Sequence, residues 1–267
     1  MKRCFLTAFA FLQAAFAAEQ IGVEPVKRTP ESDTVVLVIA IPKDGALVAS
    51  NPVWMQCRID GFSLGAGSSF DRADEIVETD MGQTIHVVVD DRPYFPINNP
   101  ALDPYIQEGW YYDTGYRFQI PFKLDKGKHL LRVFPARSFG ESLKGEKTFF
   151  ASIFSLGSEE GGKDYDLTKP YLTYNEPSNQ LYLVENKPIL LDFYLSNCEL
   201  TADGYRVRLT VDGKVNRILT SWQPYYIYGL KKGNHTVRLE LINGSGKPVQ
   251  GPFSDIQRTF TVHSASE

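Results

Sequence analysis

The sequence predicts an all-β protein made of two tandem immunoglobulin-like β-sandwich domains that follow an N-terminal signal peptide. Three observations predict this fold class. Short runs rich in β-branched and aromatic residues recur along the chain between clusters of turn-forming residues. No long stretch keeps the i, i+3, i+4 apolar spacing of a helix. The two halves of the chain also share short motifs in the same order.

The first residues have the order of a secretory signal. Lys2 and Arg3 give a positive start, an apolar run extends over 5–16, and Ala15-Phe16-Ala17 is a small-x-small triplet suited to signal peptidase. The apolar run is about 12 residues long, which is short of the roughly 20 that a spanning helix needs. We therefore predict a signal peptide over 1–18, a mature chain with no membrane span, and a destination in the periplasm, at the cell surface or outside the cell.

Composition divides the rest of the chain into a leader, two domains and a linker. Residues 19–32 are polar and contain two prolines, so we predict a flexible leader. Residues 157–167 are rich in Gly and acidic residues, which predicts a linker. The flanking segments, 33–156 and 168–264, each suit a sandwich of about 100 residues. The expected strands are 34–41, 52–60, 84–90, 116–124, 129–136 and 148–156, then 171–174, 180–184, 188–195, 205–211, 225–228, 235–241 and 259–263.

The two halves align with each other at three places. The matches are 82–91 with 204–213, 124–133 with 230–239, and Pro52 with Pro188. The first match ends a strand with an Asp, whose carboxylate can accept from backbone amides two residues further on. The second is a Leu-x-x-Gly-x-His unit, in which Gly permits a positive φ at the bend. We expect the following His ring to lie against the sandwich edge and to hydrogen-bond the backbone.

Three patterns in the first half carry a resemblance to a known class of domain. They are Pro42-x-Asp44-Gly45-x-x-Val48, His86-x-x-x-Asp90 and Leu124-x-x-Gly127-x-His129-x-Leu131. With them, residues 34–156 resemble the immunoglobulin-like (fibronectin III-like) sandwich domains of bacterial exported proteins of unknown function, and the second half resembles these domains more weakly. The resemblance implies a sandwich fold and an exported protein, and it implies no activity.

Charge and cysteine usage argue against two kinds of site. The formal net charge is −4 and no run of Lys and Arg with interleaved aromatics occurs, so we expect no nucleic-acid partner. Outside the signal the cysteines are Cys57 and Cys198, with no Cys-x-x-Cys pair, so we expect no structural zinc site. One disulfide between the halves and two unpaired buried thiols both remain open.

The halves differ most after the first Asp corner, where domain 1 carries an aromatic-rich insertion within 92–116. Loops at the end of a sandwich often carry function, and Tyr and Trp provide rigid contact area with a polar group for sugars or proteins. The predicted binding residues are Tyr94, Tyr105, Trp110, Tyr111, Tyr112 and Tyr116. The alternative is that these aromatics fold back over the end of the sandwich or the interdomain groove.

Three other groups of residues receive a structural interpretation. His86 and Asp90 lie about 13 Å apart at strand rise, so they and His129 predict no metal site. The aromatic cluster 222–228 is expected to pack in the core and edge of domain 2, with Tyr226 and Tyr228 on one face and Tyr225 on the other. The polar segment 138–145 is expected to be a solvated loop, with recognition as the alternative.

Catalysis has little support in the sequence. It contains no His-Glu-x-x-His and no phosphate loop, although a distant carboxylate pair of the glycosidase kind stays open. We therefore expect a non-catalytic exported binding module without a cofactor, whose partner is a protein or glycan of the cell envelope. The alternatives are a structural or accessory component of an envelope assembly and a cryptic hydrolase.

Overall fold

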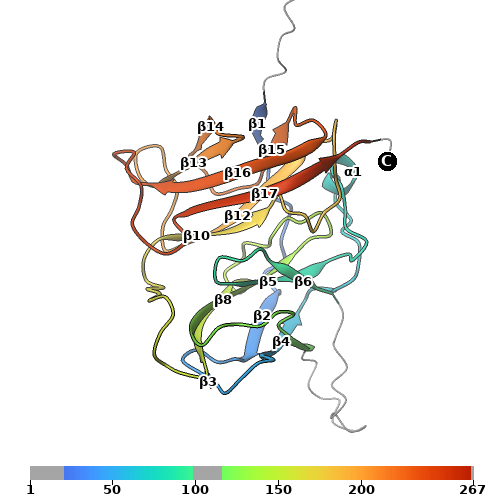
Figure 1. Ribbon diagram of the computed structural model, residues 1–267. Helices are drawn as coiled ribbons and strands as arrows, with labels where there is room; N and C mark the ends of the chain where they lie inside the picture. The colour runs from blue at the N-terminus through green and yellow to red at the C-terminus, as the bar shows by residue number, and fades with distance from the viewer. Residues whose placement is uncertain (1–20, 99–115, 266–267) are drawn as a thin grey trace, which may run out of the picture.

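The computed structural model describes residues 21–98 and 116–265 and is built almost entirely from strands (Figure 1). One short helix, α1 (Arg72–Glu75), is the exception among the described residues. The strands form four sheets that pair into two β-sandwiches, so the predicted all-β class is confirmed. No helix in the described part of the chain is long and apolar enough to cross a membrane.

Domain 1 packs a three-stranded sheet against a five-stranded sheet. The smaller sheet has the order β2-β4-β7, formed by β2 (Val36–Ile41), β4 (Trp54–Asp60) and β7 (Tyr116–Gln119). The larger sheet has the order β3-β9-β8-β5-β6, formed by β3 (Leu47–Val48), β9 (Phe150–Leu156), β8 (Gly127–Ala136), β5 (Thr84–Val89) and β6 (Phe95–Ile97). Neighbouring strands are antiparallel except for the short parallel pair of β3 and β9.

Domain 2 has the same strand order. Its larger sheet is β11-β17-β16-β13-β14, formed by β11 (Leu183–Val184), β17 (Asp255–His263), β16 (Gly233–Ile242), β13 (Arg206–Val211) and β14 (Lys214–Leu219), again with one parallel pair, β11 and β17. Its smaller sheet is β10-β12-β15, formed by β10 (Tyr171–Glu176), β12 (Ile189–Ser196) and β15 (Tyr225–Tyr228). A further strand, β1 (Gly22–Pro25), pairs with the outer edge of β15.

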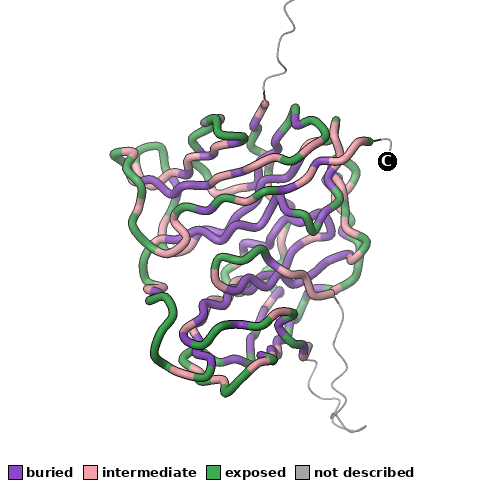
Figure 2. The backbone as a smooth tube through the Cα atoms, viewed as in Figure 1, coloured by how far each residue is buried: buried purple, intermediate pink, exposed green. Residues whose placement is uncertain are grey.

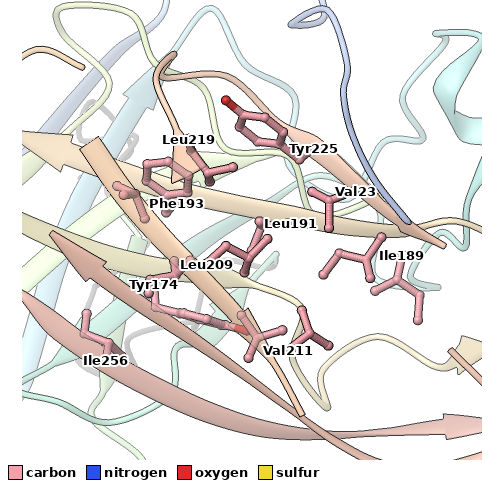
Figure 3. Close-up of a cluster of buried hydrophobic side chains, with 14 of the residues drawn as sticks. Val23, Tyr174, Ile189, Leu191, Phe193, Leu209, Val211, Leu219, Tyr225 and Ile256 are labelled. Carbon is pink, nitrogen blue, oxygen red and sulfur yellow. The ribbon is translucent and has the colours of Figure 1, made fainter. Parts of the chain in front are cut away.

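Part of the segment 19–32, predicted to be a flexible leader, is instead a paired strand, because residues 22–25 form β1. β1 lies antiparallel to β15, and the pairing continues as the Val26 amide donates to the Pro224 carbonyl at 3.0 Å. The Val23 side chain is buried in the core of domain 2 beside Ile189 and Leu191 (Figure 3). The polar composition of this segment reflects its position on a sheet edge, where main-chain pairing holds a strand with few apolar side chains.

The two sandwiches stack so that four sheet layers follow one another through the molecule (Figure 1). Every residue of β5 and of β10 is buried, and burial is nearly complete in β8 and β12, because both faces of these strands are covered. Strand β13, in the outer sheet of domain 2, instead alternates between buried and half-buried residues, as expected for a strand with one solvated face. Figure 2 shows the resulting band of buried backbone between the domains.

Each sandwich has its own apolar core, and the two cysteines lie in separate cores. Cys57 on β4 is buried in domain 1, whereas Cys198 is partly buried beside the core of domain 2. They do not form a disulfide. Burial raises the pKa of the Cys57 thiol to about 12 and that of Cys198 to about 11, so both are poor nucleophiles near neutral pH.

Candidate functional site

The contact between the sandwiches contains a buried polar network that the sequence did not reveal. Its centre is the ion pair between Lys144 Nζ and Asp192 Oδ1 at 2.5 Å, with side chains 1% and 0% exposed. The other carboxylate oxygen of Asp192 accepts from Ser142 Oγ at 2.6 Å and from Asn175 Nδ2 at 2.8 Å. A buried charge needs this number of partners to offset its desolvation. The network joins the 138–145 hairpin of domain 1 to β10 and β12.

The network continues from Asn175 to a histidine of domain 1. Asn175 Oδ1 lies 2.7 Å from His86 Nδ1, and because an amide oxygen only accepts, the imidazole donates this proton. Burial lowers the pKa of His86 to about 4, so the ring is neutral at physiological pH. His86 thus serves as a neutral link between β5 of domain 1 and β10 of domain 2.

Tyr94 extends the network to a second buried carboxyl group. Its ring stacks on His86 with centroids 3.7 Å apart, and its hydroxyl donates to Glu176 Oε1 at 2.5 Å. Burial raises the pKa of Glu176 to about 8, and its Oε2 atom has no hydrogen-bond partner. A Cβ on Gly140, whose φ is 86°, would lie 2.9 Å from the Glu176 Cγ atom, so only glycine permits this approach.

Apolar and ionic contacts complete the interface around this network. Phe134 and Tyr194 pack together from opposite domains, with ring centroids 5.4 Å apart. The Arg72 guanidinium pairs with Glu141, and Glu141 Oε1 also accepts from the Thr29 amide at 3.0 Å. The segment 21–32 therefore crosses from domain 2 to domain 1 and is held at both ends.

The expectation of a solvated loop at residues 138–145 is wrong. Residues 138–144 are buried or nearly buried at the domain contact, and Glu31 accepts from the Lys144 and Gly145 amides. The hairpin is polar because it fills an interface whose opposing surface is polar too. The hairpin therefore contacts other parts of the chain where its polar composition had predicted contact with solvent.

The aromatic cluster of domain 2 packs as its alternation predicted. Tyr225 lies in the core and Tyr226 faces domain 1, where its hydroxyl donates to Glu75 Oε2 at 2.5 Å. Tyr228 shares the face of Tyr226, with ring centroids 6.1 Å apart, and is 41% exposed. Trp222 donates from Nε1 to the Phe193 carbonyl at 2.9 Å.

The Asp and His of the matched motifs form the same corner in both domains. His129 Nδ1 lies 2.8 Å from Asp90 Oδ2, and its Nε2 lies 2.8 Å from the Asp125 carbonyl. Asp90 Oδ1 accepts from the Leu130 amide, so it bonds across to the next strand and not two residues along the turn as expected. Both imidazole nitrogens face acceptors, and the bond with Asp90 raises the pKa of His129 above its ordinary value.

The second corner repeats these contacts at the surface of domain 2. His235 Nδ1 lies 2.7 Å from Asp212 Oδ2, and its Nε2 lies 2.7 Å from the Lys231 carbonyl. Both aspartates have a positive φ, 55° at Asp90 and 50° at Asp212. His86 is engaged elsewhere, with Asn175, and the described residues contain no group of three or more His, Cys, Asp or Glu side chains able to hold a metal ion.

The predicted binding residues fall into three situations. Tyr94 is 4% exposed and forms part of the interdomain network, so it offers no free ring surface, in line with the folded-back alternative. Tyr116 is the first residue of β7, and its side chain lies outside the described part of the chain. The remaining predicted binding residues, Tyr105, Trp110, Tyr111 and Tyr112, lie outside the described residues.

The two strands that flank this segment belong to different sheets of domain 1. β6 ends at Ile97 in the larger sheet, and β7 begins at Tyr116 in the smaller sheet. The connection between them, residues 98–115, therefore crosses from one sheet to the other. The equivalent connection in domain 2, between β14 and β15, needs only residues 220–224. The connection in domain 1 is thus the longer of the two, as the comparison of the two halves of the sequence predicted.

A cleft lies where the linker meets β17, and sequence reasoning missed it. This cleft, of about 660 Å³, is lined by Asp91, residues 163–165, 251–253 and 255–258. Tyr165 stacks on Phe253 with centroids 5.9 Å apart, and the buried Arg132 guanidinium lies 4.0 Å from the Phe253 ring centroid. Three separate segments build the cleft, so no local pattern indicated it.

Comparisons with known proteins assign no family to this chain. No family model matches the sequence, and no curated protein matches it. Among solved structures, fibronectin(III)-like modules of Clostridium thermocellum CbhA are similar at 11% identity and a TM-score of 0.30, covering 86% of this chain and 96% of theirs. Sidekick-1 immunoglobulin domains 1–4 are similar at 11% identity and a TM-score of 0.23, covering 89% of this chain and 51% of that one.

One further solved structure was determined with a bound glycan. It is the Bacteroides ovatus mixed-linkage glucan utilization locus protein SGBP-B in complex with a mixed-linkage heptasaccharide, at 13% identity and a TM-score of 0.20, covering 86% of this chain and 71% of that one. At these TM-scores the fold of this chain rests on its own strand order and packing, and its ligand is not indicated by similarity.

Proposed function

We propose that this chain is an exported, non-catalytic binding module of two immunoglobulin-like domains, and that domain 1 contacts a protein or glycan partner through its aromatic segment. The observation that carries the proposal is the β6–β7 connection, which spans 98–115 where domain 2 needs only 220–224. A long connection at the end of a rigid sandwich is where such scaffolds place binding residues. Its composition supplies rings for stacking and polar groups for hydrogen bonds.

The interdomain contact supports this proposal by making one rigid scaffold of the two sandwiches. The chain crosses between the domains twice, through the segment 21–32 and through the linker 157–167, and the Lys144–Asp192 pair closes the contact between the crossings. A rigid support lowers the entropy lost when a loop meets its partner. In this proposal domain 2 holds domain 1 in place and leaves the aromatic end free to bind.

The test compares the mature protein with a variant carrying Trp110→Ala and Tyr112→Ala on a glycan array and in pull-downs from an envelope extract. A variant with Tyr182→Ala is the matched control, because Tyr182 is an aromatic that is 50% exposed on domain 2. We expect a partner held by the parent and by the control, and lost by the double variant. Circular dichroism checks the folding of all three proteins. Equal retention by the folded double variant contradicts the proposal.

A further inference from the structure

The ion pair at the domain contact places an amine against a carboxyl group where both are shielded from water. Lys144 Nζ lies 2.5 Å from Asp192 Oδ1, and the two side chains are 1% and 0% exposed. We propose that these side chains condense after folding into an amide bond between Lys144 Nζ and Asp192 Cγ, with release of water. This modification joins the two domains covalently, and it goes beyond the proposed binding function because it uses no residue of the aromatic segment.

The two atoms that would form the new bond are already close together. A C–O bond is about 1.2 Å long, so Lys144 Nζ lies no more than about 3.8 Å from Asp192 Cγ. Groups held at about 3–3.5 Å from each other react as if at very high concentration, because the entropy of bringing them together has already been lost. Lys144 is held by the hairpin 138–145 of domain 1 and Asp192 by β12 of domain 2. Folding of the two domains against each other therefore supplies the approach.

The second carboxylate oxygen of Asp192 faces three hydrogen-bond donors. Oδ2 accepts from the Ser142 amide at 3.2 Å, from Ser142 Oγ at 2.6 Å and from Asn175 Nδ2 at 2.8 Å. Attack of an amine on Cγ gives a tetrahedral intermediate with negative charge on an oxygen, and donors already aimed at that oxygen stabilise it. Ser142 and Asn175 are each 1% exposed, so water does not weaken these hydrogen bonds.

The atoms and protons of the step balance within the pair. The Lys144 ammonium first passes one proton to Asp192 Oδ1, which leaves a neutral amine and a carboxylic acid. The amine attacks Cγ to form the C–N bond, and a second nitrogen proton moves to the Oδ1 hydroxyl. The bond between Cγ and Oδ1 then breaks, and Oδ1 leaves as water. Oδ2 remains as the amide oxygen, and the step needs no oxidant, reductant or co-reactant.

The surrounding hydrogen bonds suit the amide as well as the ion pair. Lys144 Nζ also donates to the Ser142 carbonyl at 3.1 Å and to Ser142 Oγ at 2.9 Å. The one N–H of the amide can keep the bond to the Ser142 carbonyl, and the amide oxygen can keep the three donors of Oδ2. The step also removes two buried charges, and with them the cost of keeping both out of water. The product is therefore favoured by the same burial that makes an ion pair expensive.

The test is the intact mass of the folded chain, measured after denaturation. We expect most of the parent protein to be lighter than its sequence by the mass of one water. Trypsin should then release a branched peptide that joins 138–147 to 164–206, uncut after the acylated Lys144. Lys144→Arg keeps the positive charge but presents a guanidinium that stays protonated, so this variant should keep its full mass. Lys128→Arg, at the exposed ion pair with Asp164, is the matched control and should lose one water like the parent.

A second measurement keeps the test decisive if Lys144→Arg does not fold. Parent chain isolated in concentrated urea should have its full mass and should lose one water only after it is refolded. Full mass in the folded parent overturns the proposal. A loss of water that maps to any other peptide overturns it too, as does a loss that is already complete in urea, because the bond would then not depend on the fold.

Discussion

Domain 1 and domain 2 have the same strand order but differ in what covers their sheets. The clearest comparison is between Ile41 and Glu176, which both end the first strand of a smaller sheet, follow an irregularity in pairing and precede a proline. The apolar Ile41 is 40% exposed, whereas the ionisable Glu176 is 0% exposed. The smaller sheet of domain 2, which contains Glu176, is covered by domain 1, whereas the smaller sheet of domain 1, which contains Ile41, has no domain over it among the described residues. Burial in this molecule is therefore decided by the stacking of the sandwiches and not by the character of each residue.

The largest effect is expected from breaking the Lys144–Asp192 ion pair at the contact between the two domains. Asp192→Ala leaves the buried Lys144 ammonium without its carboxylate, and we expect the free energy of unfolding to fall by about 3–5 kcal/mol. Urea unfolding followed by circular dichroism measures it. The matched variant Asp255→Ala removes an exposed partner of Arg238 and should cost at most about 1 kcal/mol. Equal losses would show that the interface pair is hydrated.

The second prediction concerns pH and the carboxyl group that domain 1 buries. Burial raises the pKa of Glu176 to about 8; the charge of Asp192 adds to the rise, and hydrogen bonds from Tyr94 and Ser178 offset part of it. Between pH 4.5 and 8 the folded chain holds a proton that the unfolded chain releases. Stability therefore falls as pH rises through this window, by at most about 1.4 kcal/mol per pH unit.

Replacing this carboxyl group should flatten the profile. Glu176→Gln keeps the hydrogen-bond geometry without an ionisable proton, so its free energy of unfolding should match the parent near pH 4.5 and exceed it at pH 8. Thermal unfolding at several pH values measures the difference. A variant that follows the parent across the whole window would place the titration on another group.

The third prediction compares a buried valine on one edge strand, β1, with an exposed valine on another, β2. Val23→Ala removes two methyl groups from the core of domain 2 and should lower the free energy of unfolding by about 2 kcal/mol. Val38→Ala makes the same change on β2 of domain 1, at a side chain that is 41% exposed, and should change it by no more than about 0.5 kcal/mol. Urea unfolding of both variants gives the comparison. Similar losses would mean that β1 is not closely packed in solution.

The smallest effect is the expected difference in stability loss between variants of the two Asp–His corners. Asp90→Asn should cost about 2 kcal/mol, because Asp90 is more buried and also accepts from the Tyr165 hydroxyl at 2.8 Å, whereas Asp212→Asn should cost about 1 kcal/mol or less. The raised pKa of His129 means that its contribution is complete below about pH 6.5 and is lost as pH rises through the folded value. Thermal unfolding should therefore show a smaller loss of stability above pH 6.5 in His129→Gln than in the parent. Equal costs at the two corners would contradict the role given to burial.

Local pattern predicted the strands and the corners, and long-range contact decided the rest. β5 and β8 were expected from their runs of β-branched or other apolar residues, and the His rings of both corners were expected to bond the backbone. The segment 19–32 was predicted to be flexible from its polar composition. Its pairing could not be predicted because the partner strand, β15, lies in the other half of the chain. The hairpin 138–145 was predicted to be solvated because its residues are polar. A polar composition does not distinguish a loop exposed to solvent from one buried at a polar interface. The role of Tyr105, Trp110, Tyr111 and Tyr112 stays a prediction.

The position of β1 also sets an order of events for a chain that is made from its N-terminus. The hydrogen bond between Arg217 and Val23 joins residues 194 positions apart in sequence. Residues 22–25 are synthesised before the other described strands, yet their place beside β15 exists only after most of domain 2 has been made. Contacts of such long separation are slow to form. Strand β1 is therefore made early but is among the last of the described strands to pair, and until it pairs the edge of β15 stays open to other chains.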